Sequence, residues 1–228
     1  MPGWISLVLR RAAVLLEPIS PSRCVACHAL AGVSEPLCVR CAASLRAPRR
    51  ASVAGVPIAA AAVYRPPITT ALHRLKYGGR PDVASALARL MLPAIDSLGL
   101  DPFVLVPVPL ATRRLVERGY NQAALLAAAL SKMGPWTWAP RGLVRSHWAR
   151  PQVGLTYQMR QDNSRGNWAV PDPRAMGSRS VVLVDDVVTT GATAYSCIRA
   201  LRAIDASVVA IAAVARAGIQ SGELIGRP

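Results

Sequence analysis

Two adjacent carboxylates, Asp185 and Asp186, follow a run of β-forming residues in the most informative stretch of this 228-residue sequence. Residues 181–184 read Val-Val-Leu-Val, and a glycine-containing loop rich in threonine, 189–193, then opens a helix. Glycine allows close backbone approach, threonine hydroxyls can donate to phosphate oxygens, and a helix N-terminus presents free N–H groups. Nearby carboxylates can accept hydrogen bonds from sugar hydroxyls, directly or through Mg²⁺. The stretch therefore predicts a site for a phosphorylated sugar at the edge of a parallel sheet.

Two other interpretations of this stretch are open. Strands that end in acidic residues also occur in nucleotide hydrolases, but that interpretation requires the pattern G-x-x-x-x-G-K-[ST], which the sequence lacks. Residues 185–193 could also form a surface turn behind a core strand, with both carboxylates solvated. The whole run 181–193 fits one site geometry, which favours the ligand site over the turn.

Four of the five cysteines have the spacing of metal ligands. Cys24, Cys27, Cys38 and Cys41 form the pattern C-x₂-C-x₁₀-C-x₂-C. Two C-x₂-C turns can place four thiolates at the corners of a tetrahedron, as structural Zn²⁺ requires, and a four-sulfur site leaves no open position for catalysis. The alternatives are a redox pair or two disulfides, and disulfides are disfavoured in a cytoplasmic chain. We therefore expect a structural zinc knuckle.

A second cluster of positive charge follows a second expected strand. Phe103–Pro109 is apolar and ends in proline. Arg113, Arg114 and Arg118, with Gly119, are expected to form an anion-attracting loop between this strand and an alanine- and leucine-rich helix. The planar guanidinium of arginine can bind phosphate oxygens through two hydrogen bonds. A solvated helix start is the alternative interpretation. The phosphate loop expected at 189–193 favours a second phosphate contact here.

The rest of the sequence predicts the elements that must position these groups. A hydrophobic content of 52%, rich in Ala, Val and Leu, fits a packed α/β domain. Further strands are expected at 56–64 and 207–215, and helices at 68–76, 82–92 and 192–201. Asp82 is expected to cap the helix at 82–92.

Composition divides the chain into four parts. These are an N-terminal amphipathic helix (1–20), the zinc knuckle with a basic linker (21–50), the main domain (51–218) and a polar tail (219–228). Arginines interrupt the first apolar residues and no clean cleavage site follows, so we expect no signal peptide. No apolar run reaches the roughly 18 uncharged residues of a membrane span, and a cytoplasmic protein is expected.

Several motifs together resemble a known family. Residues 181–193 resemble the phosphoribosyl-pyrophosphate (PRPP) motif of the type I phosphoribosyltransferases. From about residue 15 to 215 the chain resembles the ComF family, competence-associated proteins that are phosphoribosyltransferase-like. Trp168 stands where the ComF family usually has phenylalanine. The resemblance is carried in order by the cysteine pattern, Leu75-Lys76-Tyr77, Val106-Pro107-Val108-Pro109, Arg118-Gly119-Tyr120-Asn121-Gln122, Gln152-x-x-Leu155, Arg160-x-x-Asn163, Gly166-Asn167-Trp168 and the PRPP motif.

This resemblance implies a fold and a set of site residues. The fold would be type I phosphoribosyltransferase-like, with a mainly parallel five-stranded sheet, helices on both faces and a small N-terminal zinc knuckle of four cysteines. Asp185 and Asp186 would be the catalytic pair at the ribose hydroxyls. The 5′-phosphate would contact Thr189, Thr190, Gly191, Ala192 and Thr193. The pyrophosphate side would comprise Val108, Pro109, Arg113, Arg114 and Arg118. A mobile loop at 145–166, including Gln152, Arg160 and Asn163, would close over the ligand.

The resemblance favours a phosphoribosyltransferase that transfers or binds 5-phosphoribosyl groups with Mg²⁺, a pentosyl-transferring glycosyltransferase whose acceptor the sequence does not indicate. The alternative is a non-catalytic protein of DNA uptake that binds single-stranded DNA with the competence machinery and uses the same pocket as a ligand sensor. A net charge of +15 favours polyanionic partners, although arginine-rich genome composition would produce the same balance. Aromatic residues make up only 5% of the chain and show no evident platform for stacking bases.

Overall fold

A computed structural model describes residues 22–99, 103–145, 168–172 and 179–217 of the chain. The expected N-terminal helix, most of the expected mobile loop and the expected tail lie outside the described residues. That loop includes Gln152, Arg160 and Asn163, whose predicted roles stay predictions. Among the described helices, none combines the length and the apolar character needed to cross a membrane.

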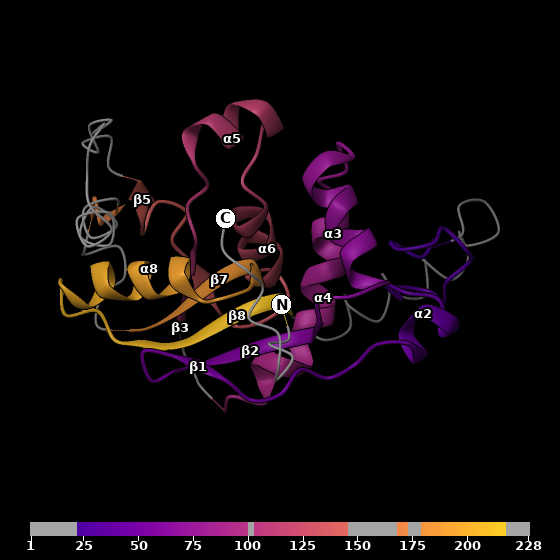
Figure 1. Cartoon of the computed structure of the whole chain (residues 1–228), viewed down its shortest axis with the longest axis horizontal. Coiled ribbons are helices and arrows are strands. Elements are labelled where there is room, and N and C mark those ends of the chain that lie inside the picture. The colour runs from indigo at the N-terminus through magenta and orange to yellow at the C-terminus, as the bar shows by residue number, and fades with distance from the viewer. Residues whose placement is uncertain (1–21, 100–102, 146–167, 173–178, 218–228) are drawn as a thin grey trace, which may run out of the picture.

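A six-stranded sheet forms the centre of the structure (Figure 1). Its strand order is β1-β2-β8-β7-β3-β4, and all neighbours are parallel except β1 and β2. A separate antiparallel ribbon contains β5 and β6. The strands are β1 (Ser52–Val53), β2 (Val56–Val63), β3 (Phe103–Pro107), β4 (Thr137–Trp138), β5 (Val144–Arg145), β6 (Trp168–Ala169), β7 (Ser180–Val188) and β8 (Val208–Arg216). The predicted α/β class with a mainly parallel sheet is confirmed.

Helices cover both faces of this sheet, so its inner strands are buried on both sides. Along β7, Val182 and Val184 belong to the core shared with α3, α4 and α6, whereas Val181 and Leu183 belong to the core shared with α8. This alternation follows from the two-residue period of a strand and explains the continuous apolar run before the acids. The helices on the first face are α3 (Ile68–Tyr77), α4 (Val83–Asp96) and α6 (Gln122–Leu130), and α8 is Ala192–Arg202.

The cysteine-rich segment lies at one end of the long axis, and β5 lies at the other (Figure 1). It contains the short helix α2 (Val39–Ala43). Its buried residues Ala26 and Leu37 belong to the same hydrophobic cluster as Leu72 of α3. Arg74 Nη1 also donates to the backbone carbonyl of Val25 at 2.8 Å. The segment is therefore packed into the main core through α3.

Three local features differ from the expectations. β7 continues past Asp185 and Asp186 to Val188 and stays paired with β8. The arginine-rich segment is a helix, α5 (Thr112–Arg118), which stands away from the sheet and ends at Gly119 with φ +80° (Figure 1). The predicted cap at Asp82 is wrong: its side chain forms two hydrogen bonds with Arg80, at 2.8 and 2.7 Å, instead of capping α4.

Candidate functional site

The connections that follow β3 and β7 lead toward opposite edges of the sheet. After β3 the chain crosses the face that carries α6 and returns at the outer strand β4, whereas after β7 it crosses by α8 and returns on the other side at β8. Neighbouring parallel strands whose connections leave on opposite faces open a crevice beyond their carboxyl ends. Topology therefore makes the ends of β3 and β7 the candidate position for a ligand site.

A cavity of about 480 Å³ lies at this position. It gathers most of the predicted ligand residues, although they are far apart in sequence: Asp185, Asp186, Thr189, Thr193, Val108, Pro109, Arg114 and Arg118. It also contains residues to which the sequence assigned no separate role: Tyr64, Lys76, Tyr77, Leu110, Ala111, Gln122, Arg145 and Val187. Predicted site residues outside this lining are Arg113, Thr190, Gly191 and Ala192.

Asp186 is buried and has partners on both carboxylate oxygens. The residue is 4% exposed. Oδ2 forms an ion pair with the Lys76 ammonium, and Oδ1 accepts a hydrogen bond from Gln122 Nε2 at 3.2 Å. Lys76 is on α3 and Gln122 begins α6, so this one carboxylate joins three elements.

Asp185 is half-buried and has few partners. Its Oδ1 accepts a hydrogen bond from the Asp186 backbone N–H at 2.8 Å. Burial, followed by the negative charge of Asp186, raises the pKa of Asp185 well above its ordinary value, while Lys76 partly offsets this rise. A hydrogen-bond donor or a cation supplied by a ligand would stabilise the charged form of Asp185.

Two guanidinium groups in the cavity, those of Arg114 and Arg145, form neither an ion pair nor a hydrogen bond with the described residues, whereas Arg118 donates to Gln122. Arg145 stacks over the Trp168 ring at 4.6 Å, and its Nε is buried without a hydrogen bond. Burial lowers the pKa of Arg145, and the nearby charge of Arg114 acts in the same direction. Unpaired arginines at a partly buried site are stabilised by an anion that neutralises both. The positive charges of Arg114 and Arg145 therefore favour an anionic ligand in this cavity.

The segment 118–122 supports the cavity rim through a series of specific contacts. Tyr120 Oη donates to the Leu75 carbonyl at 2.6 Å, and Asn121 Nδ2 donates to the Val108 carbonyl at 2.9 Å. The Asn121 side chain also caps α6 by accepting from the Ala123 N–H. Arg118 donates to Gln122 and lies 5.2 Å from the Tyr77 ring centroid. These contacts fix α3, the loop after β3 and α6 relative to one another.

The loop 189–193 divides between two cavities. Thr189 and Thr193 face the cavity with the acids, whereas Thr190, Gly191 and Ala192 line a second cavity of about 800 Å³ beside α8. Gly191 has φ +78°, and a Cβ there would lie 2.6 Å from Val53 Cγ2. The glycine is thus required by backbone conformation and by close packing against β1.

Arg113 is positioned differently from its neighbours on α5. Its side chain is 91% exposed, and Nε donates to Glu117 Oε1 at 2.8 Å in an i,i+4 pair. Arg114 and Arg118 line the cavity. A seven-residue helix presents successive side chains in different directions, so the three arginines cannot all face one ligand.

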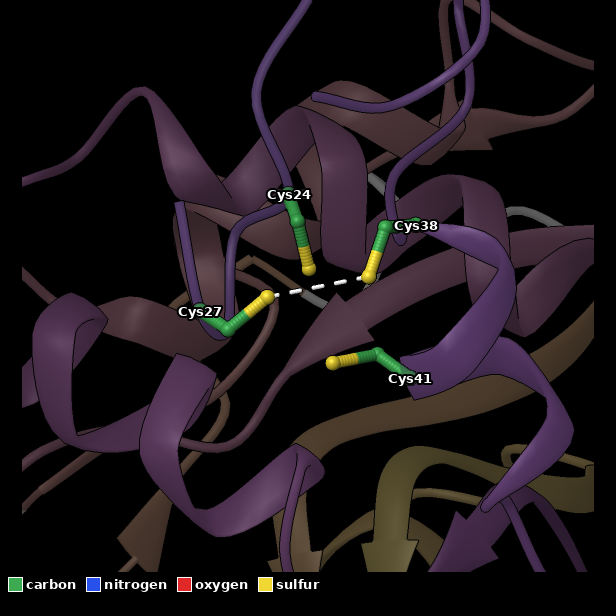
Figure 2. A group of neighbouring side chains, drawn as sticks. All are labelled: Cys24, Cys27, Cys38 and Cys41. Carbon is green, nitrogen blue, oxygen red and sulfur yellow. Dashed lines mark hydrogen bonds between the residues drawn. The ribbon is translucent and has the colours of Figure 1, made fainter. Parts of the chain in front are cut away.

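The four N-terminal cysteines converge on a single point (Figure 2). Their sulfur atoms all lie within 4.8 Å of one another, and Cys27 Sγ and Cys38 Sγ are 3.6 Å apart. Tetrahedral Zn–S bonds of about 2.3 Å place sulfur atoms roughly 3.8 Å apart. All five cysteines are free, so the disulfide alternative is not observed. The four-cysteine cluster is therefore compatible with structural zinc.

Local contacts shift the pKa values of Cys24 and Cys41 in opposite directions. Burial alone would raise the pKa of Cys24, but backbone hydrogen bonds from Cys38, Cys27 and Ala26 lower it to about 6. Burial and the neighbouring thiols raise the pKa of Cys41 to about 12. The thiolate that is stabilised at Cys24 is the form of cysteine that binds a metal ion. Cys197 lies apart, buried on α8.

Sequence reasoning missed several contributors to the cavity. Lys76, Tyr77 and Gln122 appeared only as parts of motifs that resemble a family, and Arg145 was assigned to a mobile loop. Their roles depend on which distant element each one meets. Only the i,i+4 spacing of Arg118 and Gln122 on adjoining elements was a local signal.

Comparison with known proteins identifies the family. No family model matches the chain. Competence protein F of Haemophilus influenzae is 32% identical over 164 residues, which cover 68% of this chain and 70% of that protein. The chain belongs to the ComF family. ComFC of Bacillus subtilis is 28% identical over 137 residues, which cover 57% of this chain and 51% of that competence protein.

A further relative of this ComF protein carries a different name. The DNA utilization protein YhgH of Escherichia coli strain K12 is 36% identical over 135 residues. The alignment covers 57% of this chain and 59% of YhgH, so the chain spans less than two thirds of that relative. The names of these relatives refer to competence and DNA utilization and do not mention a ligand.

Proposed function

We propose that this ComF protein binds PRPP, with Mg²⁺, in the cavity beyond β3 and β7. The observation that carries the proposal is that two guanidiniums without an acidic partner among the described residues, those of Arg114 and Arg145, line the same cavity as Asp185. PRPP combines a pyrophosphate, a ribose and a 5′-phosphate. The cavity offers arginines for the pyrophosphate, a carboxylate for the ribose hydroxyls and threonine hydroxyls for the 5′-phosphate. The parallel strands β2, β8, β7, β3 and β4 support assignment to the type I phosphoribosyltransferase fold.

The residues present suit the chemistry of pentosyl transfer. When pyrophosphate leaves the ribose, positive charge grows on the sugar and negative charge grows on the leaving group. Arg114, Arg118 and Arg145 would hold the pyrophosphate oxygens. Asp185 would accept from a ribose hydroxyl, and Thr189 with Thr193 would donate to the 5′-phosphate at the α8 N-terminus. Bound Mg²⁺ would supply further charge neutralisation at the pyrophosphate.

We also propose that the four-cysteine cluster holds zinc in a purely structural role. The sulfur spacing and the backbone hydrogen bonds to Cys24 support this assignment. All four positions of a tetrahedral ion would be filled by protein ligands, which leaves none for a substrate.

Calorimetric titration of PRPP and Mg²⁺ into the zinc-loaded protein tests the main proposal. We expect micromolar affinity, weaker binding of ribose 5-phosphate and of inorganic pyrophosphate, and loss of binding when Arg114 and Arg145 are both replaced by alanine. Release of pyrophosphate from PRPP in an acceptor screen would establish catalysis. Absence of PRPP binding by the unsubstituted protein would overturn the proposal.

Single-stranded DNA binding is the second candidate function, with the cavity as a ligand sensor. The names of the relatives and a net charge of +15 favour it. A DNA-binding role in competence predicts that affinity for a single-stranded oligonucleotide falls steeply with salt, with a slope of about −0.7 per phosphate contact on a logarithmic plot. An oligonucleotide titration across a salt series tests this, and no measurable affinity at low salt would exclude it.

A further inference from the structure

We propose that the two adjacent carboxylates have separate roles: Asp185 contacts the ribose of the ligand, and Asp186 is a positioning residue that holds Lys76 and Gln122. This inference rests on the proposed function, because it names which residue of the cavity meets the sugar. It departs from the sequence-based expectation that both acids hold ribose hydroxyls.

Strand geometry separates the two side chains. Asp185 pairs in register with Ala213 of β8, and Val187 pairs with Ala215, so both acids lie inside a regular part of β7. Adjacent residues of a strand point to opposite faces of the sheet. Asp186 accordingly meets α3 and α6. Asp185 lies on the side of α8, which carries Cys197. Burial raises the pKa of the Cys197 thiol, and the negative charge of Asp185 raises it further.

The contacts of Asp186 leave little capacity for a ligand. Lys76 forms an ion pair with Oδ2, Gln122 donates to Oδ1, and only 4% of the residue is exposed. Oδ2 itself is buried and accepts no hydrogen bond from the described residues. A ribose hydroxyl could reach this oxygen only by displacing the Lys76 ammonium, which would separate a buried ion pair at a cost in stability. Asp185 has free acceptor capacity and greater exposure in the same cavity.

Asp186 instead acts on the ligand through other residues. Gln122 donates to Asp186 and accepts from Arg118, so the carboxylate orients an arginine of the pyrophosphate side. Its ion pair with Lys76 fixes the end of α3, where Tyr77 lies against Arg118. Loss of Asp186 should therefore disturb pyrophosphate binding and stability, whereas loss of Asp185 should disturb recognition of the ribose alone.

The test compares Asp185→Asn with Asp186→Asn by calorimetry, using PRPP and inorganic pyrophosphate as separate probes at constant Mg²⁺, together with thermal unfolding. For Asp185→Asn we expect about a tenfold loss of PRPP affinity, typical of one charge-assisted hydrogen bond. Its pyrophosphate affinity should stay within about twofold, and its melting temperature should be equal or higher. For Asp186→Asn we expect a lower melting temperature and weaker binding of both probes.

Lys76→Met supplies the matched control for the positioning role. If Asp186 acts by holding Lys76, the double variant Lys76→Met/Asp186→Asn should unfold at a higher temperature than the sum of the two single losses predicts. Equal losses of PRPP affinity in Asp185→Asn and Asp186→Asn, with stability and pyrophosphate binding unchanged in both, would overturn the division of roles. PRPP binding that tolerates Asp185→Asn would also overturn it. Failure of the unsubstituted protein to bind PRPP overturns instead the proposed function on which the inference rests.

Discussion

The cysteine knuckle and the ligand cavity are built in opposite ways. All four knuckle ligands come from one short segment, residues 24–41, and their spacing alone determines that the sulfurs can meet. The cavity is assembled from α3, the segment 108–122, β5, β7 and the loop before α8. A site encoded by local spacing can be found in the sequence residue by residue, whereas a site encoded by topology shows only those parts that form a motif.

Removal of the proposed zinc would test how separate the two regions are. Zinc-finger peptides gain about 10–16 kcal/mol from metal binding, so chelation, or Cys24→Ser with Cys38→Ser, should cause the largest loss of stability. Because the knuckle shares a core with α3, we expect the whole domain to melt at a lower temperature in circular dichroism, with weaker pyrophosphate binding. Cys197→Ala is the control and should keep its metal. Unchanged melting of the main domain would show that the regions are independent.

Substitution of Gly191 in the loop 189–193 tests a close contact that the sequence does not reveal. Gly191→Ala combines a positive φ with a clash against Val53, and each effect costs about 1–3 kcal/mol. Gly119→Ala has a similar φ of +80° with nothing within 4 Å, so it should lose only the backbone part. Denaturant unfolding measures both variants. Equal losses, or a difference that persists when Val53 is replaced by alanine, would contradict the packing explanation.

The raised pKa of Asp185 predicts a pH-dependent stability. Above its folded-state pKa the charged carboxylate destabilises the native protein, and this cost is lost as pH falls towards about 4, where the unfolded group also becomes protonated. Asp185→Asn should therefore stabilise the protein at neutral pH, by roughly 1.4 kcal/mol for each pH unit by which the pKa is raised, and have little effect below about pH 4. Denaturant unfolding between pH 4 and 8 measures it, and a pH-independent difference would contradict the assignment.

The smallest effect should separate two neighbouring arginines of equal charge. Arg114 lines the cavity, whereas Arg113 is exposed and pairs with Glu117. We expect Arg114→Ala to weaken pyrophosphate binding about tenfold and Arg113→Ala to change it less than about twofold. Each variant is the control for the other, because both remove one positive charge from α5. Equal losses at moderate salt would show that long-range attraction dominates over direct contact.

The strands and the polar motifs could be predicted because their signals are local. The apolar run before Asp185, the four-cysteine spacing and the strand at Phe103–Pro107 were all visible in the sequence. The partners of Asp186 could not be predicted, since Lys76 and Gln122 meet it only after α3 and α6 pack on the same face of the sheet.

Two local predictions were wrong. The segment with Arg113 was expected to be a loop, because it lies between a strand and a helix and contains a glycine, yet Thr112–Arg118 forms a helix that ends at this glycine. Asp82 has the residue type of a helix cap, but Arg80 two positions earlier provides a stronger, charge-assisted partner. At Asp82 the preference of the residue type was outweighed by this specific neighbour.

The position of β8 affects how the chain can fold during synthesis. This strand lies between β2 and β7, although it is the last of the strands described here to be translated. Until Val208–Arg216 leaves the ribosome, β2 has no parallel neighbour and one edge of β7 stays open, whereas all four cysteines of the proposed zinc site have already been translated. A ribosome stalled before residue 208 would therefore carry an ordered knuckle joined to an unfinished sheet, with apolar strand edges exposed to chaperones.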